Sequence, residues 1–147
     1  MELKELVDRY QAAINLVYRK VSILLKEKIN VDITSDQFPT LQYIANNKKC
    51  TSTDIAYTFG IGKSAVTAQV NRLFDKGLII RERDERDRRV VYLLATEKGR
   101  EFVTHTEKIL FEVLGKYLSN FEDEEISTFI QLLEKLARIM DEGEVDE

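Results

Sequence analysis

The sequence predicts a mainly α-helical protein with one small β-hairpin, and three observations support this fold class. Hydrophobic residues make up 44% of the 147 positions and proline occurs once, which is typical of helix-rich globular domains. Over most of the chain the apolar residues recur every three or four positions, which is the helical period. The exception is residues 78–94, where two runs rich in β-branched residues flank a charged turn.

The first predicted helix runs from residue 3 to about residue 29. Its apolar residues alternate at spacings of four and three, which is the heptad pattern of a helix that packs along one seam. The seam consists of Leu3, Val7, Tyr10, Ile14, Val17, Val21 and Leu24. Two interpretations fit this pattern equally well: a seam against a second copy of the chain, and an ordinary core helix of a monomer.

Three short helices follow, and the turn between the last two is typical of a helix-turn-helix unit. Thr34 or Ser35 is expected to cap the first of these helices, and Thr51 the second. The inward side of the second is expected to hold Ile55, Ala56 and Phe59. Residues 60–62, Gly-Ile-Gly, form a tight turn before a helix at residues 63–76.

A hairpin and two more helices complete the predicted order. Residues 78–83 and 90–94 are expected to be strands, and residues 84–89 form the charged turn between them. Thr96 opens a helix, and the last helix begins at Asn120 or Asp123. The order predicts a winged helix-turn-helix flanked by long terminal helices.

The net charge of −4 is distributed unevenly along the chain. Residues 34–100 hold 12 basic and 8 acidic residues, and residues 1–33 hold 6 and 5. Residues 101–147 hold 4 and 13. A basic middle segment beside an acidic end indicates that the middle faces a polyanion, for which we expect double-stranded DNA.

The exposed face of the predicted helix at 63–76 suits phosphates and base edges. Its first turn combines backbone N–H groups, a positive dipole end, an ammonium and hydroxyls. The candidate DNA-binding residues of this helix are Lys63, Ser64, Thr67, Gln69, Asn71 and Arg72. Gln69 is suited to pair with adenine and Arg72 with a phosphate. A merely solvated helix face fits the pattern of this helix equally well.

The charged turn supplies a second set of candidates: Asp84, Arg86 and Arg88. An arginine on a loop that projects from two strands can place its guanidinium in the narrow minor groove, where the potential is most negative. We expect Asp84 to position Arg86 rather than to contact DNA. The competing interpretation is a charged, solvated turn.

Catalysis, metal binding and a membrane location are not expected. One cysteine and one histidine leave no internal disulfide and no metal site, and no nucleophile–base pair or cofactor motif is present. Cys50 is expected to be a structural thiol rather than a redox sensor. The longest apolar run, residues 90–95, is too short to span a bilayer, and the acidic N-terminal residues do not fit a secretory signal. We therefore expect a cytoplasmic protein that is not an enzyme.

Five segments together resemble the MarR (multiple antibiotic resistance regulator) family. They are residues 64–67 (Ser-Ala-Val-Thr), 71–73 (Asn-Arg-Leu), 76–79 (Lys-Gly-Leu-Ile), 84–89 (Asp-Glu-Arg-Asp-Arg-Arg) and 96–99 (Thr-Glu-Lys-Gly), and Arg81 also fits the pattern. The acidic and arginine-rich turn followed by Thr-Glu-Lys-Gly at this spacing is the most specific of these features. The resemblance extends by pattern to the terminal helices.

The resemblance implies a homodimeric transcription regulator, usually a repressor of a pseudo-palindromic operator that is released by a small lipophilic or phenolic effector. It implies dimerisation helices at residues 1–33 and 101–147 and a winged helix-turn-helix DNA-binding domain at residues 34–100. It also implies that Arg86 enters the minor groove with support from Asp84. A different class of function remains open at this point: a winged helix that binds other proteins through its acidic C-terminal helices, without specific DNA binding.

Overall fold

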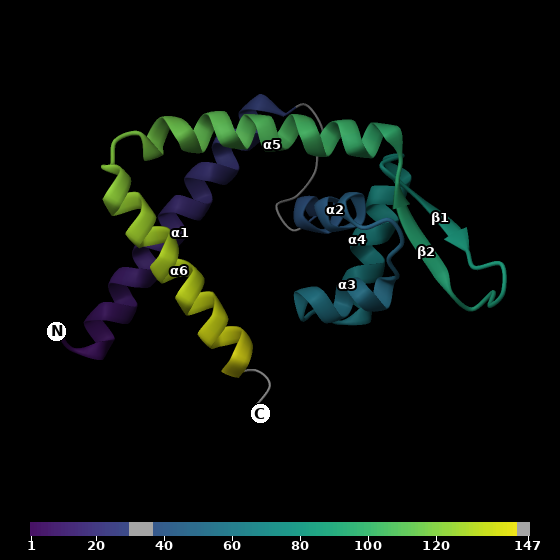
Figure 1. Ribbon diagram of the computed structural model, residues 1–147, viewed down its shortest axis with the longest axis horizontal. Coiled ribbons are helices and arrows are strands. Elements are labelled where there is room, and N and C mark those ends of the chain that lie inside the picture. The colour runs from purple at the N-terminus through teal and green to yellow at the C-terminus, as the bar shows by residue number, and fades with distance from the viewer. Residues whose placement is uncertain (30–36, 144–147) are drawn as a thin grey trace. The chain divides into compact units, whose positions relative to one another are not determined.

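The computed structural model describes residues 1–29 and 37–143 and confirms the predicted fold class (Figure 1). Its elements are α1 (Leu3–Lys28), α2 (Gln37–Asn46), α3 (Ser52–Phe59), α4 (Lys63–Asp75), β1 (Ile79–Arg83), β2 (Val91–Ala95), α5 (Glu97–Leu118) and α6 (Asp123–Gly143). The predicted caps Thr34 and Ser35 lie outside the described residues. The chain divides into two units, residues 1–110 and 111–147, and the border falls within α5.

The helix-turn-helix forms where its capping residues predict it. The Thr51 hydroxyl accepts a hydrogen bond from the Asp54 N–H at 3.2 Å, and the Asp54 carboxylate accepts one from the Thr51 N–H at 2.9 Å. This capping box fixes the start of α3. Gly60 ends α3 in the left-handed conformation, with φ of 62°, and partly buried Ile61 packs against the core.

The end of α4 leads directly into the hairpin. Gly77 has φ of 74°, and its N–H donates to the Phe74 carbonyl at 2.9 Å. The N–H of Leu78 donates to the Leu73 carbonyl at 3.0 Å, so a Schellman motif closes the helix. Leu78 therefore belongs to this closing turn, and β1 begins one residue later than the sequence predicts.

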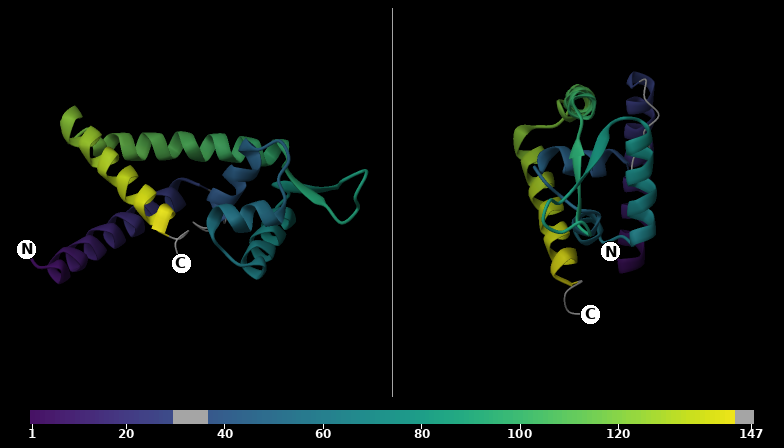
Figure 2. Two further views of the ribbon diagram at one scale, coloured as in Figure 1. Left: turned by 60° about the horizontal axis from the view of Figure 1, so that its bottom comes forward. Right: turned by 90° about the vertical axis from the view of Figure 1, so that its right-hand side faces the viewer.

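The antiparallel hairpin runs from the pair Ile79–Ala95 to the pair Arg83–Val91. We call β1, β2 and the turn between them the wing, and its turn extends away from the three short helices (Figure 2). On the inner side the wing is joined to the loop after α2, because the Leu93 N–H donates to the Cys50 carbonyl at 2.7 Å. The wing is thus anchored to the rest of the winged helix through the middle of β2.

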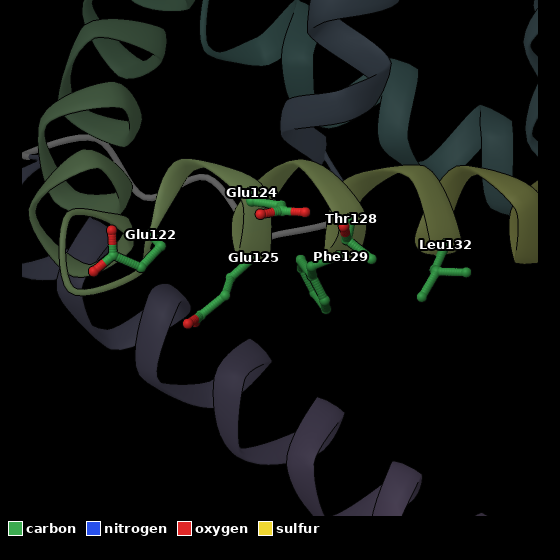
Figure 3. A pocket seen from close by; sticks show the side chains of 6 residues that line it. All are labelled: Glu122, Glu124, Glu125, Thr128, Phe129 and Leu132. Carbon is green, nitrogen blue, oxygen red and sulfur yellow. The ribbon is translucent and has the colours of Figure 1, made fainter.

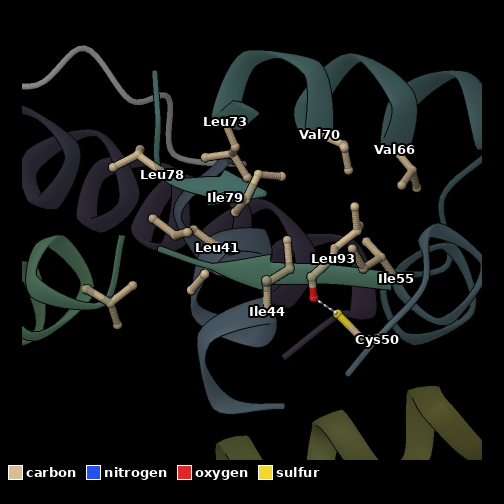
Figure 4. Packing of buried hydrophobic residues seen from close by; sticks show 12 residues of the cluster. Leu41, Ile44, Cys50, Ile55, Val66, Val70, Leu73, Leu78, Ile79 and Leu93 are labelled. Carbon is tan, nitrogen blue, oxygen red and sulfur yellow. Dashed lines mark hydrogen bonds between the residues drawn. The ribbon is translucent and has the colours of Figure 1, made fainter. Parts of the chain in front are cut away.

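The core lies between α2, α3, α4, the hairpin and the first turns of α5 (Figure 4). Its buried members are Leu41, Ile44, Cys50, Ile55, Val66, Val70, Leu73, Leu78, Ile79, Leu93, Ala95 and Val103. Phe59 is not among them, contrary to the sequence prediction, because 38% of it stays exposed at the end of α3. Its ring instead packs against that of Tyr43 in a T-shaped arrangement, with 5.8 Å between the ring centres.

The two terminal helices have a different character. Neither α1 nor α6 contains a buried residue, although each carries a stripe of large apolar side chains. Within the described chain, no helix combines the length and apolar character needed to cross a bilayer.

The start of α5 is held tightly against the end of α4. The Thr96 hydroxyl donates to the Gly77 carbonyl at 2.7 Å and accepts from the Gly99 N–H at 3.0 Å. The Thr96 N–H donates to the Leu78 carbonyl at 3.0 Å. A methyl group on Gly99 would overlap that same carbonyl, so the close approach depends on glycine at this position.

Gly99→Ala is expected to lower the free energy of unfolding by about 1–3 kcal/mol, because the added methyl group forces the two segments apart. Gly115→Ala in the same helix is the matched control, since nothing lies within 4 Å of its added methyl group. That change is expected to raise the free energy of unfolding by about 0.5–1 kcal/mol through helix propensity. Urea unfolding at one protein concentration measures both, and equal effects would contradict the close contact.

Candidate nucleic-acid interface

The helix α4 presents one polar face to solvent. Lys63, Ser64, Thr67, Asn71 and Arg72 are exposed, as the sequence predicts. Gly62 is the N-cap residue of α4 and has no side chain to cap the first N–H groups. The first bond of the helix joins the Val66 N–H to the Gly62 carbonyl at 3.2 Å. The N–H groups of the first turn and the positive end of the helix dipole therefore remain available to an anion.

Gln69 does not lie on this face, and its predicted contact with adenine is wrong. Only 8% of Gln69 is exposed, and its Oε1 accepts a hydrogen bond from the Thr40 hydroxyl of α2 at 2.5 Å. The reason is helical geometry, since Gln69 lies three residues after Val66 and four before Leu73 on the buried side. This spacing could have predicted that Gln69 is buried, but the polar amide favoured an exposed position.

Asn71 is bound to the hairpin by Arg81, which is not among the predicted DNA-binding residues. Arg81 of β1 donates from Nη2 to the Asn71 Oδ1 at 2.6 Å, and its guanidinium lies 4.5 Å from the centre of the Phe74 ring. This combination of a hydrogen bond and a cation–π contact ties the wing to α4. The bond engages one of the two lone pairs of the Asn71 oxygen and orients the Asn71 amide.

Asp84 organises the turn of the wing. Its Oδ1 accepts hydrogen bonds from the Arg86 N–H at 2.8 Å and the Asp87 N–H at 3.0 Å. Its Oδ2 accepts one from the Tyr92 hydroxyl at 2.9 Å. The N–H groups of Asp87 and Arg86 hold the pKa of the Asp84 carboxyl below its ordinary value, and the Tyr92 hydroxyl adds to this effect.

The arginines of the wing have different surroundings. The Arg89 guanidinium pairs with both carboxylate oxygens of Asp87 at 3.1 Å, and Arg83 donates to the Arg88 carbonyl at 3.2 Å. Arg86 and Arg88 are exposed, and their guanidinium groups make no hydrogen bond or ion pair with the residues that the structure describes. Two unpaired positive groups thus project from a turn whose backbone is fixed.

Cys50 has the environment of a structural thiol. It is 2% exposed, and its Sγ lies 3.7 Å from the Leu93 carbonyl oxygen. Burial, with a smaller contribution from the charge of Asp54, raises the pKa of the thiol from 9.0 to about 11. The thiolate needed for redox chemistry is therefore disfavoured at neutral pH.

An open pocket lies at the start of α6, apart in sequence from the α4 face and the wing (Figure 3). Its lining residues are Glu122, Glu124, Glu125, Thr128, Phe129 and Leu132. The three carboxylates make this surface unsuitable for a phosphate backbone. The positive groups suited to nucleic acid belong to α4 and the wing.

Comparison with known proteins identifies the relatives of this chain. The MarR family model matches residues 31–90, which include the helix-turn-helix and most of the wing. The transcriptional regulator ZitR of Lactococcus lactis subsp. cremoris is 33% identical over 141 residues, which span 90% of this chain and 97% of ZitR.

Solved structures share the fold. A MarR family protein from Bacillus stearothermophilus is 26% identical with a TM-score of 0.76, and the match covers 96% of this chain and 99% of that one. FabT of Streptococcus pneumoniae, crystallised in complex with DNA, has a TM-score of 0.82 at 24% identity, with coverage of 96% and 99%.

Members of the MarR family are winged-helix transcription factors without enzymatic activity. The motifs of α4 and the wing agree with the match to the family model and with the identity to ZitR over most of both chains. They also agree with the shared fold. This chain belongs to the MarR family of transcriptional regulators.

Proposed function

We propose that this protein is a homodimeric repressor that binds a pseudo-palindromic operator and leaves it when a small lipophilic or phenolic effector binds. In this proposal residues 34–100 contact DNA, and residues 1–33 and 101–147 form the dimer. The proposed DNA contacts are made by Lys63, Ser64, Thr67, Asn71, Arg72, Arg86 and Arg88, with Asp84 in a positioning role.

The observation that carries the DNA-binding proposal is the pairing of two surfaces of different chemistry. The exposed face of α4 offers N–H groups and short polar side chains, which suit the major groove. The wing offers the unpaired guanidinium groups of Arg86 and Arg88, which suit the negative potential of the minor groove. The contact of Arg81 with Asn71 and Phe74 links these two surfaces, so that they can engage one duplex together.

The FabT complex supports the same assignment, because a protein of this fold has been crystallised with DNA. A module that binds only other proteins has no need of two unpaired arginines at the end of a hairpin. The repressor role and the release by an effector rest on the resemblance to the MarR family.

The dimer is supported by the apolar stripes of the terminal helices. In α1, Val17 is 57% exposed and Tyr10 is 52% exposed. In α6, Phe129 is 55% exposed and Met140 is 62% exposed. Contiguous apolar surface of this kind is costly in water and is typical of protein interfaces. A second copy of the chain, with the same stripes, supplies a matching apolar surface.

Arg86→Ala is expected to weaken binding to a duplex selected by the wild-type protein about tenfold or more, because a specific contact in a groove contributes about 1–3 kcal/mol. Arg89→Ala removes the same charge from the same turn, but Asp87 already holds that guanidinium. The control is therefore expected to show a clearly smaller loss. Fluorescence anisotropy at fixed salt measures both, and equal losses would show that charge alone matters.

Val17→Asp is expected to convert the dimer to monomer at micromolar concentration, because it places a charge within the apolar seam of α1. Ala12→Asp adds the same charge to the opposite side of the helix, where no seam residue lies, and is expected to leave the dimer intact. Sedimentation velocity distinguishes the two states. A Val17→Asp protein that sediments as wild type would remove α1 from the interface.

A further inference from the structure

Tyr92 of β2 connects the turn of the wing to the body of the winged helix. Its side chain lies on the face of β2 opposite to Leu93, which is buried in the core. Its hydroxyl donates to the Asp84 Oδ2 at 2.9 Å, eight residues away along the chain. The ammonium of Lys49, in the segment between α2 and α3, lies 5.0 Å from the centre of its ring.

These contacts form a continuous path to the backbone of Arg86. Lys49 is positioned over the ring of Tyr92, the Tyr92 hydroxyl binds one oxygen of Asp84, and the other oxygen binds the Arg86 N–H. The hairpin ladder ends at Arg83, and beyond it the Asp84 N–H donates to the Val90 carbonyl at 2.9 Å and the Val90 N–H donates to the Asp87 carbonyl at 3.0 Å. The Asp84 carboxylate accepts hydrogen bonds from the N–H groups of Arg86 and Asp87 at the tip, and the Tyr92 hydroxyl fixes the rotation of that carboxylate.

We propose that Tyr92 is a positioning residue that presents Arg86 to DNA by fixing the carboxylate of Asp84. This inference rests on the proposed function, since it assigns a role in DNA binding to a residue that does not itself touch DNA. A wing turn that is ordered before binding loses less conformational entropy when Arg86 enters the groove. The Tyr92 hydroxyl therefore raises the affinity for DNA by ordering the wing turn in the free protein.

The protonation behaviour of the pair agrees with this geometry. The hydrogen bond to Asp84 raises the pKa of the Tyr92 hydroxyl above its ordinary value of 10.0, and the negative charge of Asp84 acts in the same direction. The same bond, after the two backbone N–H groups, lowers the pKa of the Asp84 carboxyl. At neutral pH the phenol is therefore a donor and the carboxylate an acceptor.

Tyr92→Phe is the direct test, because it removes the hydroxyl while the ring remains under Lys49. In the free protein, the amide hydrogens of Arg86 and Asp87 are expected to exchange several-fold faster, since the carboxylate that accepts them is no longer held. Affinity for the duplex selected by the wild type is expected to fall about three- to tenfold, with an unchanged thermal midpoint. Tyr43→Phe, which removes a hydroxyl from a partly buried ring in α2, is the matched control and is expected to change neither quantity.

A double-mutant cycle with Arg86→Ala separates positioning from general stabilisation. If Tyr92 acts through Arg86, Tyr92→Phe causes no further loss of affinity once Arg86 is alanine. The proposal would be overturned if Tyr92→Phe lowered the affinity for DNA equally with arginine and with alanine at position 86. It would also be overturned if Tyr92→Phe alone changed neither the amide exchange nor the affinity. Failure of the proposed function is a separate result: the wild-type protein would then bind no duplex more tightly than a scrambled one.

Discussion

The buried stripe of α4 is the constraint on which the remaining arrangement depends. Val66, Val70 and Leu73 pack into the core, and Gln69 between them bonds to the hydroxyl of Thr40 on α2. With this side fixed, helical geometry places Ser64, Thr67 and Asn71 on the outer side. The Schellman turn at Gly77 then sends the chain into β1 in a defined direction, so the position of the wing also follows from how α4 is packed.

The wing adds a different kind of order, which comes from polar contacts rather than burial. Arg81 ties its first strand to α4, and Tyr92 ties its second strand to Asp84 and Lys49. The carboxylate of Asp84 then binds the backbone of the turn that carries Arg86. Arg86 therefore keeps its charged guanidinium exposed while its backbone is already ordered. This suits an electrostatic contact with a narrow groove.

Local signals predicted most of the fold, and long-range partners account for what they missed. The capping box at Thr51 and the glycines at 60 and 77 depend on neighbouring residues, so the sequence is enough to place them. Gln69 was assigned to the wrong face because its polarity outweighed its helical position. Asn71, the partner of Arg81, lies ten residues away in α4, and the turn at Gly77 brings the two together. Asp84, the partner of Tyr92, lies eight residues away across the hairpin, and the register of the folded strands brings them together.

If two copies of this chain read two related half-sites in DNA, selection of bound fragments from a random duplex pool will recover both half-sites in one duplex. Anisotropy then compares the selected duplex with a scrambled one at the same salt concentration. We expect a palindrome whose half-sites lie about one helical turn apart, bound at least about a thousandfold more tightly than the scramble. Weak binding that does not distinguish the two duplexes would contradict it.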